Sequence, residues 1–497
     1  MLHFPHRLPH HLRLLLAFLL VVAGCSGSEQ PSPGQSTIAW TPCPGQAVLE
    51  CGRIEVPVDR AVTDGAQLSI ALARIPAGDP GRRIGSLVLH FGGPGSSGVE
   101  YLATVGRSLV PAEIAARFDL VAFDQRGVGR TAPIDCFDDP TLDGYVWAEN
   151  PPRDPSAEDL TTAYAEARRF AAACEQHSGL ANLNAVSSLD TVDDLEAIRI
   201  ALGDGGLSYL GFSYGGLLGA LYADAYPTHV RAMILDGAVE PGLTFAARLS
   251  EQAVAFETGL SRFLVDCDRR PACPFGASSE IGASESFDAL LERLRTTPLP
   301  LEDGRVLNAG MALSGVMAGL YARETWGTVA AGLARAADGD GSILAALADS
   351  YVGRDHDGGY KNNSVEANTA INCADYAASH EPRDYLELAE TSRQSAPRFA
   401  ALLAFSGLTC AAWPGTPEPV GRVSAKGAPA IVVIGTTGDP AAPYTWSARL
   451  ADQLESGILL TYQNAGHTAV GTGSPCIDTA VAAYLVDLNV PAVGSLC

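Results

Sequence analysis

Six apolar runs along the chain predict buried β-strands, each followed by a loop of glycine or polar residues. They lie in the stretches GSLVLHFGGPGSSG, FDLVAFDQRGVGRT, LSYLGFSYGG, VRAMILDGAV, APAIVVIGTTGDPAAPY and GILLTYQNAGHTAVG. Before the third run, TVDDLEAIRIALG has helical spacing, with Leu195, Ile198 and Leu202 on one face and Thr191 near its start. Strands that alternate with helices predict an α/β fold, with a mostly parallel sheet covered on both faces.

Between about residues 241 and 425 the strand pattern stops and alanine-rich stretches with helical spacing replace it. Examples are SFDALLERLRTT and TVAAGLARAADG, and proline-rich breaks such as WPGTPEPVG interrupt them. Because strands resume afterwards, this segment predicts a mainly helical domain inserted between two strands. We expect residues 39–240 and 426–497 to form the core, and residues 241–425 to form a lid over its active edge.

The first 24 residues have the features of an export signal. Arg7 and Arg13 precede the apolar run LLLAFLLVVAG, which is too short to span a bilayer as a permanent helix. The run ends at Cys25 in a segment that resembles a bacterial lipobox; an ordinary secretion signal cut nearby is the alternative. We expect a lipoprotein signal peptide at 1–24, a lipidated Cys25 and a flexible tether at 25–38. The protein would be lipid-anchored at the cell envelope, or secreted.

The charge of the chain excludes one class of partner. The formal net charge is −23, and loss of the two arginines in the signal makes it −25. No basic patch is present to neutralise phosphates, so nucleic acid is not expected as a partner. Such an acidic surface would not bind anionic lipid headgroups either, so any membrane contact is expected through the lipid alone.

Ten cysteines follow Cys25, and an even number in an exported chain predicts disulfide bonds. Connectivity cannot be deduced from the sequence, but pairing successive cysteines closes local loops. The expected pairs are Cys43–Cys51, Cys136–Cys174, Cys267–Cys273, Cys373–Cys410 and Cys476–Cys497. Metal binding is the alternative, but no two cysteines have C-x-x-C spacing, and Cys174 with His177 lacks a second ligand pair. We expect no metal and no cofactor.

The segment Gly211-Phe212-Ser213-Tyr214-Gly215 matches the nucleophile elbow, in which a serine occupies a sharp strand-to-helix turn. A serine hydroxyl is a poor nucleophile near neutral pH. It needs a base within hydrogen-bond reach, an acid that orients the base, and donors for the oxyanion. The motif therefore indicates a catalytic serine only if Ser213 has such partners.

Asp439 and His467 supply the acid and the base in the order Ser, Asp, His. Asp439 directly follows the strand stretch AIVVIGTT, although a turn aspartate in a Gly-Asp-Pro break is the alternative. His467 follows the last strand after a glycine, where a surface-loop histidine is the alternative. The 28 residues between them leave room for a helix and a strand. We expect Ser213, Asp439 and His467 to meet beyond the carboxyl ends of the strands.

Two backbone N–H groups are required for the oxyanion hole. We expect one from Tyr214, the residue after the nucleophile, and the other from the loop HFGGPGSSG, at Gly93 or else Gly92. A phosphate cradle is the alternative for this loop. It is disfavoured because no Lys-Ser or Lys-Thr follows the loop and no G-x-G-x-x-G spacing opens a helix.

Several of these segments together resemble the prolyl iminopeptidase-like branch of the α/β-hydrolases. HFGGPGSSG is similar to its H-G-G-P-G segment and FDQRGVGRT to its D-Q-R-G-x-G-x-S segment, and GFSYGG, TGDPAAPY and NAGHTAVG also fit. The segments around the cysteines, such as AINCADY and TCAAWP, resemble the exported tripeptidyl-aminopeptidase-like serine peptidases of bacteria. The likeness runs from about residue 39 to 497. Phe91, an extra residue in the H-G-G-P-G run, and Thr131, in place of serine, depart from the pattern.

The resemblance implies an α/β-hydrolase fold and a peptidase that removes short peptides, often tripeptides, from a free N-terminus. Such an enzyme needs an anion that binds the α-ammonium of a peptide or protein substrate. Asp375 is a candidate, and Glu366 and Glu324 are others, although each could be an ordinary solvated or capping carboxylate. We expect Asp124 and Arg126 to be structural, as a buried ion pair or a loop organiser.

Two other functions use the same residues differently. A carboxylesterase or lipase would share the triad, because both reactions pass through an acyl-enzyme. An ammonium-binding carboxylate over the site would favour the peptidase, and a wholly apolar groove the esterase. A non-catalytic binding lipoprotein could keep the fold, but the presence of the serine, acid, histidine and oxyanion segments argues against it.

Overall fold

The structure is a computed structural model that describes residues 37–497, apart from 47, 63–64, 149–151, 271–272 and 276–281. The expected signal peptide at 1–24, the lipidated Cys25 and most of the tether lie outside the described residues. Within the described ranges, no helix is both long enough and apolar enough to cross a membrane.

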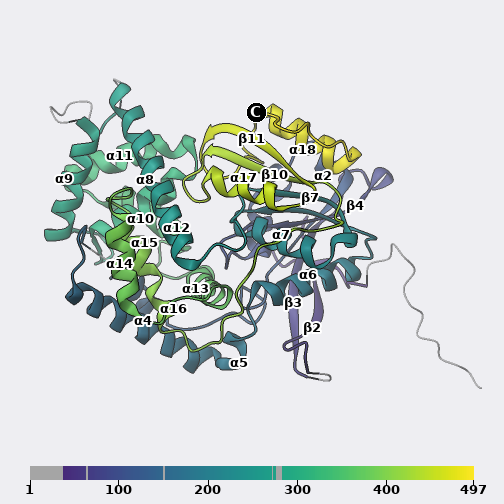
Figure 1. Cartoon of the computed structure of the whole chain (residues 1–497), viewed down its shortest axis with the longest axis horizontal. Coiled ribbons are helices and arrows are strands. Elements are labelled where there is room, and N and C mark those ends of the chain that lie inside the picture. The colour runs from purple at the N-terminus through teal and green to yellow at the C-terminus, as the bar shows by residue number, and fades with distance from the viewer. Residues whose placement is uncertain (1–36, 47, 63–64, 149–151, 271–272, 276–281) are drawn as a thin grey trace, which may run out of the picture. The chain divides into compact units, whose positions relative to one another are not determined.

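A mostly parallel sheet forms the centre of the core (Figure 1). Among the described residues it has nine strands in the order β1-β2-β3-β5-β4-β6-β7-β10-β11. The pairs from β5 to β11 are parallel, whereas β1, β2 and β3 form an antiparallel edge next to β5. The bounds are β1 Thr41–Pro42, β2 Glu50–Pro57, β3 Gln67–Ile75, β4 Gly85–His90, β5 Phe118–Phe123, β6 Leu207–Phe212, β7 Val230–Asp236, β10 Ile431–Gly438 and β11 Gly457–Ala465.

Helices cover both faces of this sheet because successive residues of its buried strands point to opposite sides. In β4, Leu87 and Leu89 pack into one hydrophobic cluster with α1, α2 and α18, while Val88 packs into another with α6, α7 and α17. The bounds are α1 Gly98–Val105, α2 Ala112–Arg117, α6 Ser188–Leu202, α7 Tyr214–Ala225, α17 Tyr444–Gln453 and α18 Pro475–Asp487. This arrangement confirms the expected α/β fold.

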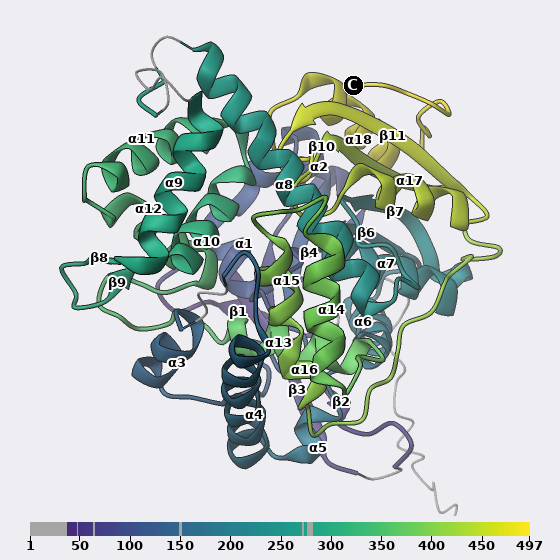
Figure 2. The same ribbon diagram turned by 60° about the vertical axis from the view of Figure 1, so that its left-hand side comes forward.

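The chain between the neighbouring strands β7 and β10 is mainly helical. Figures 1 and 2 both show α8–α12 grouped together to one side of the sheet. These helices have a hydrophobic cluster of their own, which includes Phe256, Phe263, Phe287 and Leu333. The bounds are α8 Phe245–Arg269, α9 Gly282–Thr296, α10 Ala309–Leu320, α11 Trp326–Ala337, α12 Ser342–Val352, α13 Ser364–Asp375, α14 Pro382–Ser392, α15 Ala400–Ser406 and α16 Leu408–Ala411; the short strands β8 Leu299–Pro300 and β9 Val306–Leu307 pair with each other.

Two features of the core differ from the expectation. The antiparallel edge strands β2 and β3 were not among the six predicted strands. The helices α3 Asp139–Val146, α4 Ala157–Ser178 and α5 Leu180–Leu183 follow β5, and α4 packs against α14 and α16 of the inserted segment. The helix α4, which precedes residue 241 in the sequence, therefore packs with helices of the inserted segment.

The disulfide bonds join the successive cysteines that the sequence suggested. The pairs are Cys43–Cys51, Cys136–Cys174, Cys267–Cys273, Cys373–Cys410 and Cys476–Cys497. Each disulfide closes a loop whose ends already lie side by side in the fold, and such a link destabilises the unfolded chain by restricting it.

Candidate active site

Ser213 occupies the sharp turn between β6 and α7. Its backbone has φ 57° and ψ −120°, a conformation that is strained for a residue with a side chain and that is typical of functional sites. The flanking glycines are needed because the backbone is crowded here. A Cβ on Gly211 would lie 2.2 Å from the carbonyl oxygen of Gly215, and a Cβ on Gly215 would lie 2.5 Å from that of His90. The turn lifts the serine beyond the end of the sheet.

Asp439 and His467 come together at the same end of the sheet, because they follow the neighbouring parallel strands β10 and β11. The Nδ1 atom of His467 lies 2.9 Å from Oδ1 and 2.8 Å from Oδ2 of Asp439. The Asp439 carboxylate is itself held by the N–H groups of Ala441 and Ala442, which donate to Oδ1 over 2.9 and 2.8 Å. With Nδ1 bound to the carboxylate, the Nε2 atom is the nitrogen available for proton transfer.

Electrostatics favour the protonated form of His467. Burial lowers the pKa of the imidazole, but the charge and hydrogen bond of Asp439 and the charge of Asp236 outweigh it, so the pKa is raised above its usual 6.5. The carboxylates therefore stabilise the imidazolium that forms when the histidine takes a proton.

Asp236, the last residue of β7, is a second acid at this site that the sequence analysis did not identify. Its buried carboxylate accepts hydrogen bonds from the N–H groups of Ala469 (2.9 Å) and Val470 (2.8 Å), two and three residues after His467. Burial raises the pKa of Asp236 to about 7. An aspartate that ends a buried strand, as Asp439 nearly does, was the available signal in the sequence.

Ser213 and His467 line one pocket of about 900 Å³, together with Gly93 and Thr468. Within the described part of the chain, no hydrogen bond joins the Ser213 hydroxyl to His467. Such catalytic hydrogen bonds are often long in unliganded enzymes and shorten when substrate binds. The structure thus brings the three expected residues to one rim, with the Asp–His contact made and the Ser–His contact open.

The glycine loop after β4 packs directly against the elbow. A Cβ on Gly92 would lie 2.9 Å from Cβ of Ser213 and 3.3 Å from the backbone nitrogen of Tyr214, so only glycine allows this approach. The N–H of Gly92 donates to Nδ1 of His90 over 3.2 Å and is therefore occupied. Among the described residues, the N–H groups of Gly93 and Tyr214 have no acceptor. These two donors fit an oxyanion hole better than Gly92 does.

A buried polar network runs beneath this loop and includes Asp375. His90 Nε2 lies 2.8 Å from the Gln125 side-chain oxygen, and the Gln125 amide donates to the Tyr214 hydroxyl over 3.4 Å. Tyr214 contacts the Ser188 hydroxyl, which donates to Asp375 over 2.6 Å. Burial lowers the pKa of His90 to about 4, so this histidine is neutral and can accept from Gly92.

The structure does not bring the three carboxylates expected at the substrate N-terminus into the pocket. Asp375 is buried and accepts hydrogen bonds from the backbone and hydroxyl of Ser188. Glu366 accepts from the N–H groups of Cys136 and Phe137, over 2.8 and 3.2 Å. Glu324 lies exposed in the short helix Arg323–Thr325. None of them is among the residues that line the pocket. Their positions depend on tertiary packing, which the spacing in the sequence did not reveal.

The inserted segment contacts the histidine loop itself. The N–H of His467 donates to the carbonyl oxygen of Tyr321 over 2.7 Å, and the Tyr321 ring meets the imidazole edge-on with centroids 5.1 Å apart. A single β-bridge joins the adjacent residues Ala322 and Gly466. Tyr321, with Tyr351, also lines the pocket.

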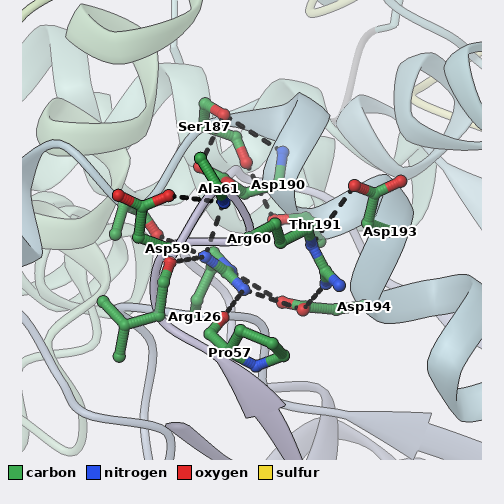
Figure 3. Close-up of polar contacts among 12 residues, drawn as sticks. Pro57, Asp59, Arg60, Ala61, Arg126, Ser187, Asp190, Thr191, Asp193 and Asp194 are labelled. Carbon is green, nitrogen blue, oxygen red and sulfur yellow. Dashed lines mark hydrogen bonds and ion pairs between the residues drawn. The ribbon is translucent and has the colours of Figure 1, made fainter. Parts of the chain in front are cut away.

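The loop after β5 is held by ion pairing and hydrogen bonds rather than by contact with the pocket. Figure 3 shows the Arg126 guanidinium facing Asp194, with Nε–Oδ2 and Nη2–Oδ1 distances of 2.7 and 2.8 Å. Asp124 instead accepts from the Ser97 hydroxyl (2.7 Å) and from the Val99 N–H (3.0 Å). Both residues organise loops behind the glycine loop, but Arg126 pairs with Asp194 and not with Asp124.

Known proteins are similar to this sequence over most of its length. Residues 396–497 match the family described as TAP-like protein. The chain is 38% identical to the serine protease Hip1 of Mycobacterium tuberculosis, over 97% of this chain and 95% of that protein. It is 34% identical to the carboxylesterase B of the same species, over 97% of each. It is 30% identical to the tripeptidyl aminopeptidase of Streptomyces lividans, over 88% of this chain and 81% of that protein.

Proposed function

Because the chain belongs to the TAP-like family of α/β-hydrolase serine peptidases, we propose that it is an exported aminopeptidase that releases short peptides of tripeptide type from substrate N-termini. Ser213 is the nucleophile, His467 the general base and acid, and Asp439 the residue that orients the histidine. The observation that carries this proposal is the 2.8 Å contact between His467 Nδ1 and Asp439 at the rim of a pocket that also contains Ser213.

The reaction proceeds through an acyl-enzyme. His467 Nε2 takes the proton of the Ser213 hydroxyl as its Oγ attacks the scissile carbonyl, and the N–H groups of Gly93 and Tyr214 donate to the resulting oxyanion. The imidazolium then gives its proton to the departing amine as the C–N bond breaks. In the second half, His467 takes a proton from the water that attacks the ester carbonyl. It returns this proton to Ser213 Oγ as the ester C–O bond breaks, which releases the short peptide and restores the serine.

Carboxylesterase activity is the second candidate, and one observation favours it. Among the described residues that line the pocket there is no carboxylate, so no anion for a substrate ammonium is evident. One relative with 34% identity is a carboxylesterase B. In the peptidase, the N-terminus would instead be bound by uncharged acceptors or by a carboxylate that reaches the pocket when substrate enters.

Two measurements separate these functions. Labelling by a fluorophosphonate that disappears in Ser213→Ala would assign the nucleophile, and absence of labelling in the native protein would indicate a binding protein instead. The kcat/KM for tripeptide amides of the Ala-Ala-Pro type would then be compared with kcat/KM for short-chain p-nitrophenyl esters. We expect release of intact tripeptides only from substrates with a free N-terminus. Equal turnover of N-acetylated peptides, or turnover of esters alone, would refute the aminopeptidase.

Export and anchoring belong to the same proposal. Five disulfide bonds suit an oxidising compartment, and the sequence before Cys25 suits a lipoprotein signal. Cys25→Ala is expected to release the protein from the membrane fraction without loss of activity. Membrane retention of this variant would exclude lipidation at Cys25.

A further inference from the structure

Three aromatic rings form a continuous row beside the nucleophile, and one of them is the extra residue of the glycine loop. Phe91 stacks on Tyr101 of α1 with ring centroids 4.3 Å apart and an interplanar angle of 27°. Phe91 also lies nearly parallel to Phe212, with centroids 6.1 Å apart and an angle of 7°. Phe212 immediately precedes Ser213, so the row ends at the catalytic serine.

The row forms one wall of the pocket that contains Ser213 and His467. Tyr101 is 46% exposed, so its ring keeps free surface although it stacks on Phe91. Val105, Leu109 and Val470 complete this wall, and no charged side chain occurs among its described residues. An exposed, uncharged aromatic surface in a pocket favours a large apolar group of the ligand.

The position of this wall relative to His467 indicates which part of the substrate it meets. His467 must give its proton to the departing amine, so that amine lies beside the imidazole. The loop that follows His467 supplies Val470 and Gly471 to the same pocket lining. A Cβ on Gly471 would lie 3.1 Å from the Leu109 carbonyl oxygen, so this loop and the segment after α1 are in direct contact. The aromatic row and the histidine loop are thereby joined through α1 and the segment that follows it.

We propose that Phe91, Tyr101 and Phe212 form an apolar subsite for the leaving group, so that the enzyme selects substrates with a large apolar residue directly after the cleaved bond. This inference rests on the proposed hydrolase function. It also gives a role to Phe91, the residue by which the glycine loop departs from the H-G-G-P-G pattern.

The test compares peptides with an identical tripeptide at the N-terminus and either leucine, phenylalanine or glycine after the cleaved bond. The native enzyme is expected to have the higher kcat/KM for leucine and phenylalanine. Tyr101→Ala is expected to lower this preference over glycine by about tenfold, the effect of losing part of an apolar contact. Tyr101→Phe is the matched control, because it keeps the ring and should keep the preference. Thermal unfolding checks that Tyr101→Ala, at a half-exposed position of α1, keeps the fold, and the kcat/KM for the glycine peptide is the internal reference for each variant.

An unchanged leucine-to-glycine ratio in Tyr101→Ala would overturn the subsite. The subsite would also be overturned if Tyr101→Ala changed the preference for the residue before the cleaved bond to the same extent. Esters of one acid with benzyl or methyl alcohol address the same subsite without a peptide, because the alcohol is then the leaving group. If the native protein cleaves no peptide but Tyr101→Ala lowers its benzyl preference, the aminopeptidase proposal fails while the subsite stands. If peptides are cleaved but Tyr101→Ala changes neither the leucine-to-glycine ratio nor the benzyl-to-methyl ratio, the subsite proposal fails while the aminopeptidase proposal stands.

Discussion

Asp439→Asn changes one atom beside His467, and the surrounding hydrogen bonds predict how the new side chain will point. Oδ1 of Asp439 accepts from both Ala441 and Ala442, over 2.9 and 2.8 Å. The amide oxygen of asparagine will keep this position, because an NH₂ group there would leave two buried N–H donors without an acceptor. The NH₂ group must then take the place of Oδ2, which is 2.8 Å from His467 Nδ1.

This orientation favours the wrong tautomer of the histidine. The asparagine NH₂ can only donate, so an NH₂ that lies 2.8 Å from Nδ1 of His467 favours an Nδ1 that accepts and a proton on Nε2. The retained oxygen, 2.9 Å from Nδ1, already accepts from Ala441 and Ala442. An Nε2 that carries a proton cannot take the proton of Ser213. The same change costs other Ser-His-Asp enzymes about 10⁴ in kcat, which corresponds to about 5 kcal/mol in the activation free energy. We expect a loss of this order here, with little change in KM.

The assay is the steady-state hydrolysis of a chromogenic ester and of a tripeptide amide, together with the rate of fluorophosphonate labelling. All three should fall together, because each requires an activated serine. Asp452→Asn, at an exposed position of α17, is the matched control and should leave the rates unchanged. A loss of less than about tenfold in kcat, with the fold shown intact by thermal unfolding, would refute the orienting role of Asp439.

Three further predictions follow from the structure. Activity should rise with pH through the raised pKa of His467, so the acid limb should have its midpoint above 6.5; a flat profile between about pH 5 and 8 would contradict the histidine as base. The double variant Cys373→Ser with Cys410→Ser should lower the free energy of unfolding by about 3 kcal/mol in urea titrations, and an unchanged midpoint would show that this disulfide does not stabilise the fold. Burial raises the pKa of Asp375 to about 7 from its ordinary 3.8, so the folded state binds this proton more tightly than the unfolded state, and stability should fall as pH rises between these values. Asp375→Asn should flatten that part of the stability profile, whereas a slope identical to that of the native protein would exclude Asp375 as its source.

Much of the fold was evident in the sequence because its signals are local. The apolar runs of β4 to β7 and of β10 are almost completely buried, and buried strands appear as continuous apolar segments in any context. The strand β11 at the edge of the sheet is only partly buried, but its apolar run GILL still indicated it. The antiparallel strands β2 and β3 were missed, since residues of both strands remain partly exposed and their pattern mixes polar with apolar positions. Partial exposure therefore hides a strand when polar residues interrupt its apolar run.

The candidate triad was also accessible to sequence reasoning, because strand ends in a parallel sheet converge on one edge. Ser213, Asp439 and His467 each follow a strand, and their order along the chain sufficed to select them. The choice between Gly92 and Gly93 as oxyanion donor was made only by the fold. The N–H of Gly92 donates to His90, whereas that of Gly93 has no acceptor in the part of the chain that the structure describes. Phe91 was visible only as an irregularity in a motif, and its stacking partner Tyr101 could not be known.

What the sequence alone determined were the features that depend on neighbours along the chain: buried strands, a glycine-flanked serine and the succession of acid and base. The tertiary structure decided the features that depend on contacts between distant segments. It directed Asp375 and Glu366 away from the pocket, placed Asp236 against the histidine loop and joined Tyr321 to His467. The reason is that the direction of a side chain is set by which helix or loop packs against its own element, and such contacts leave no regular spacing in the sequence.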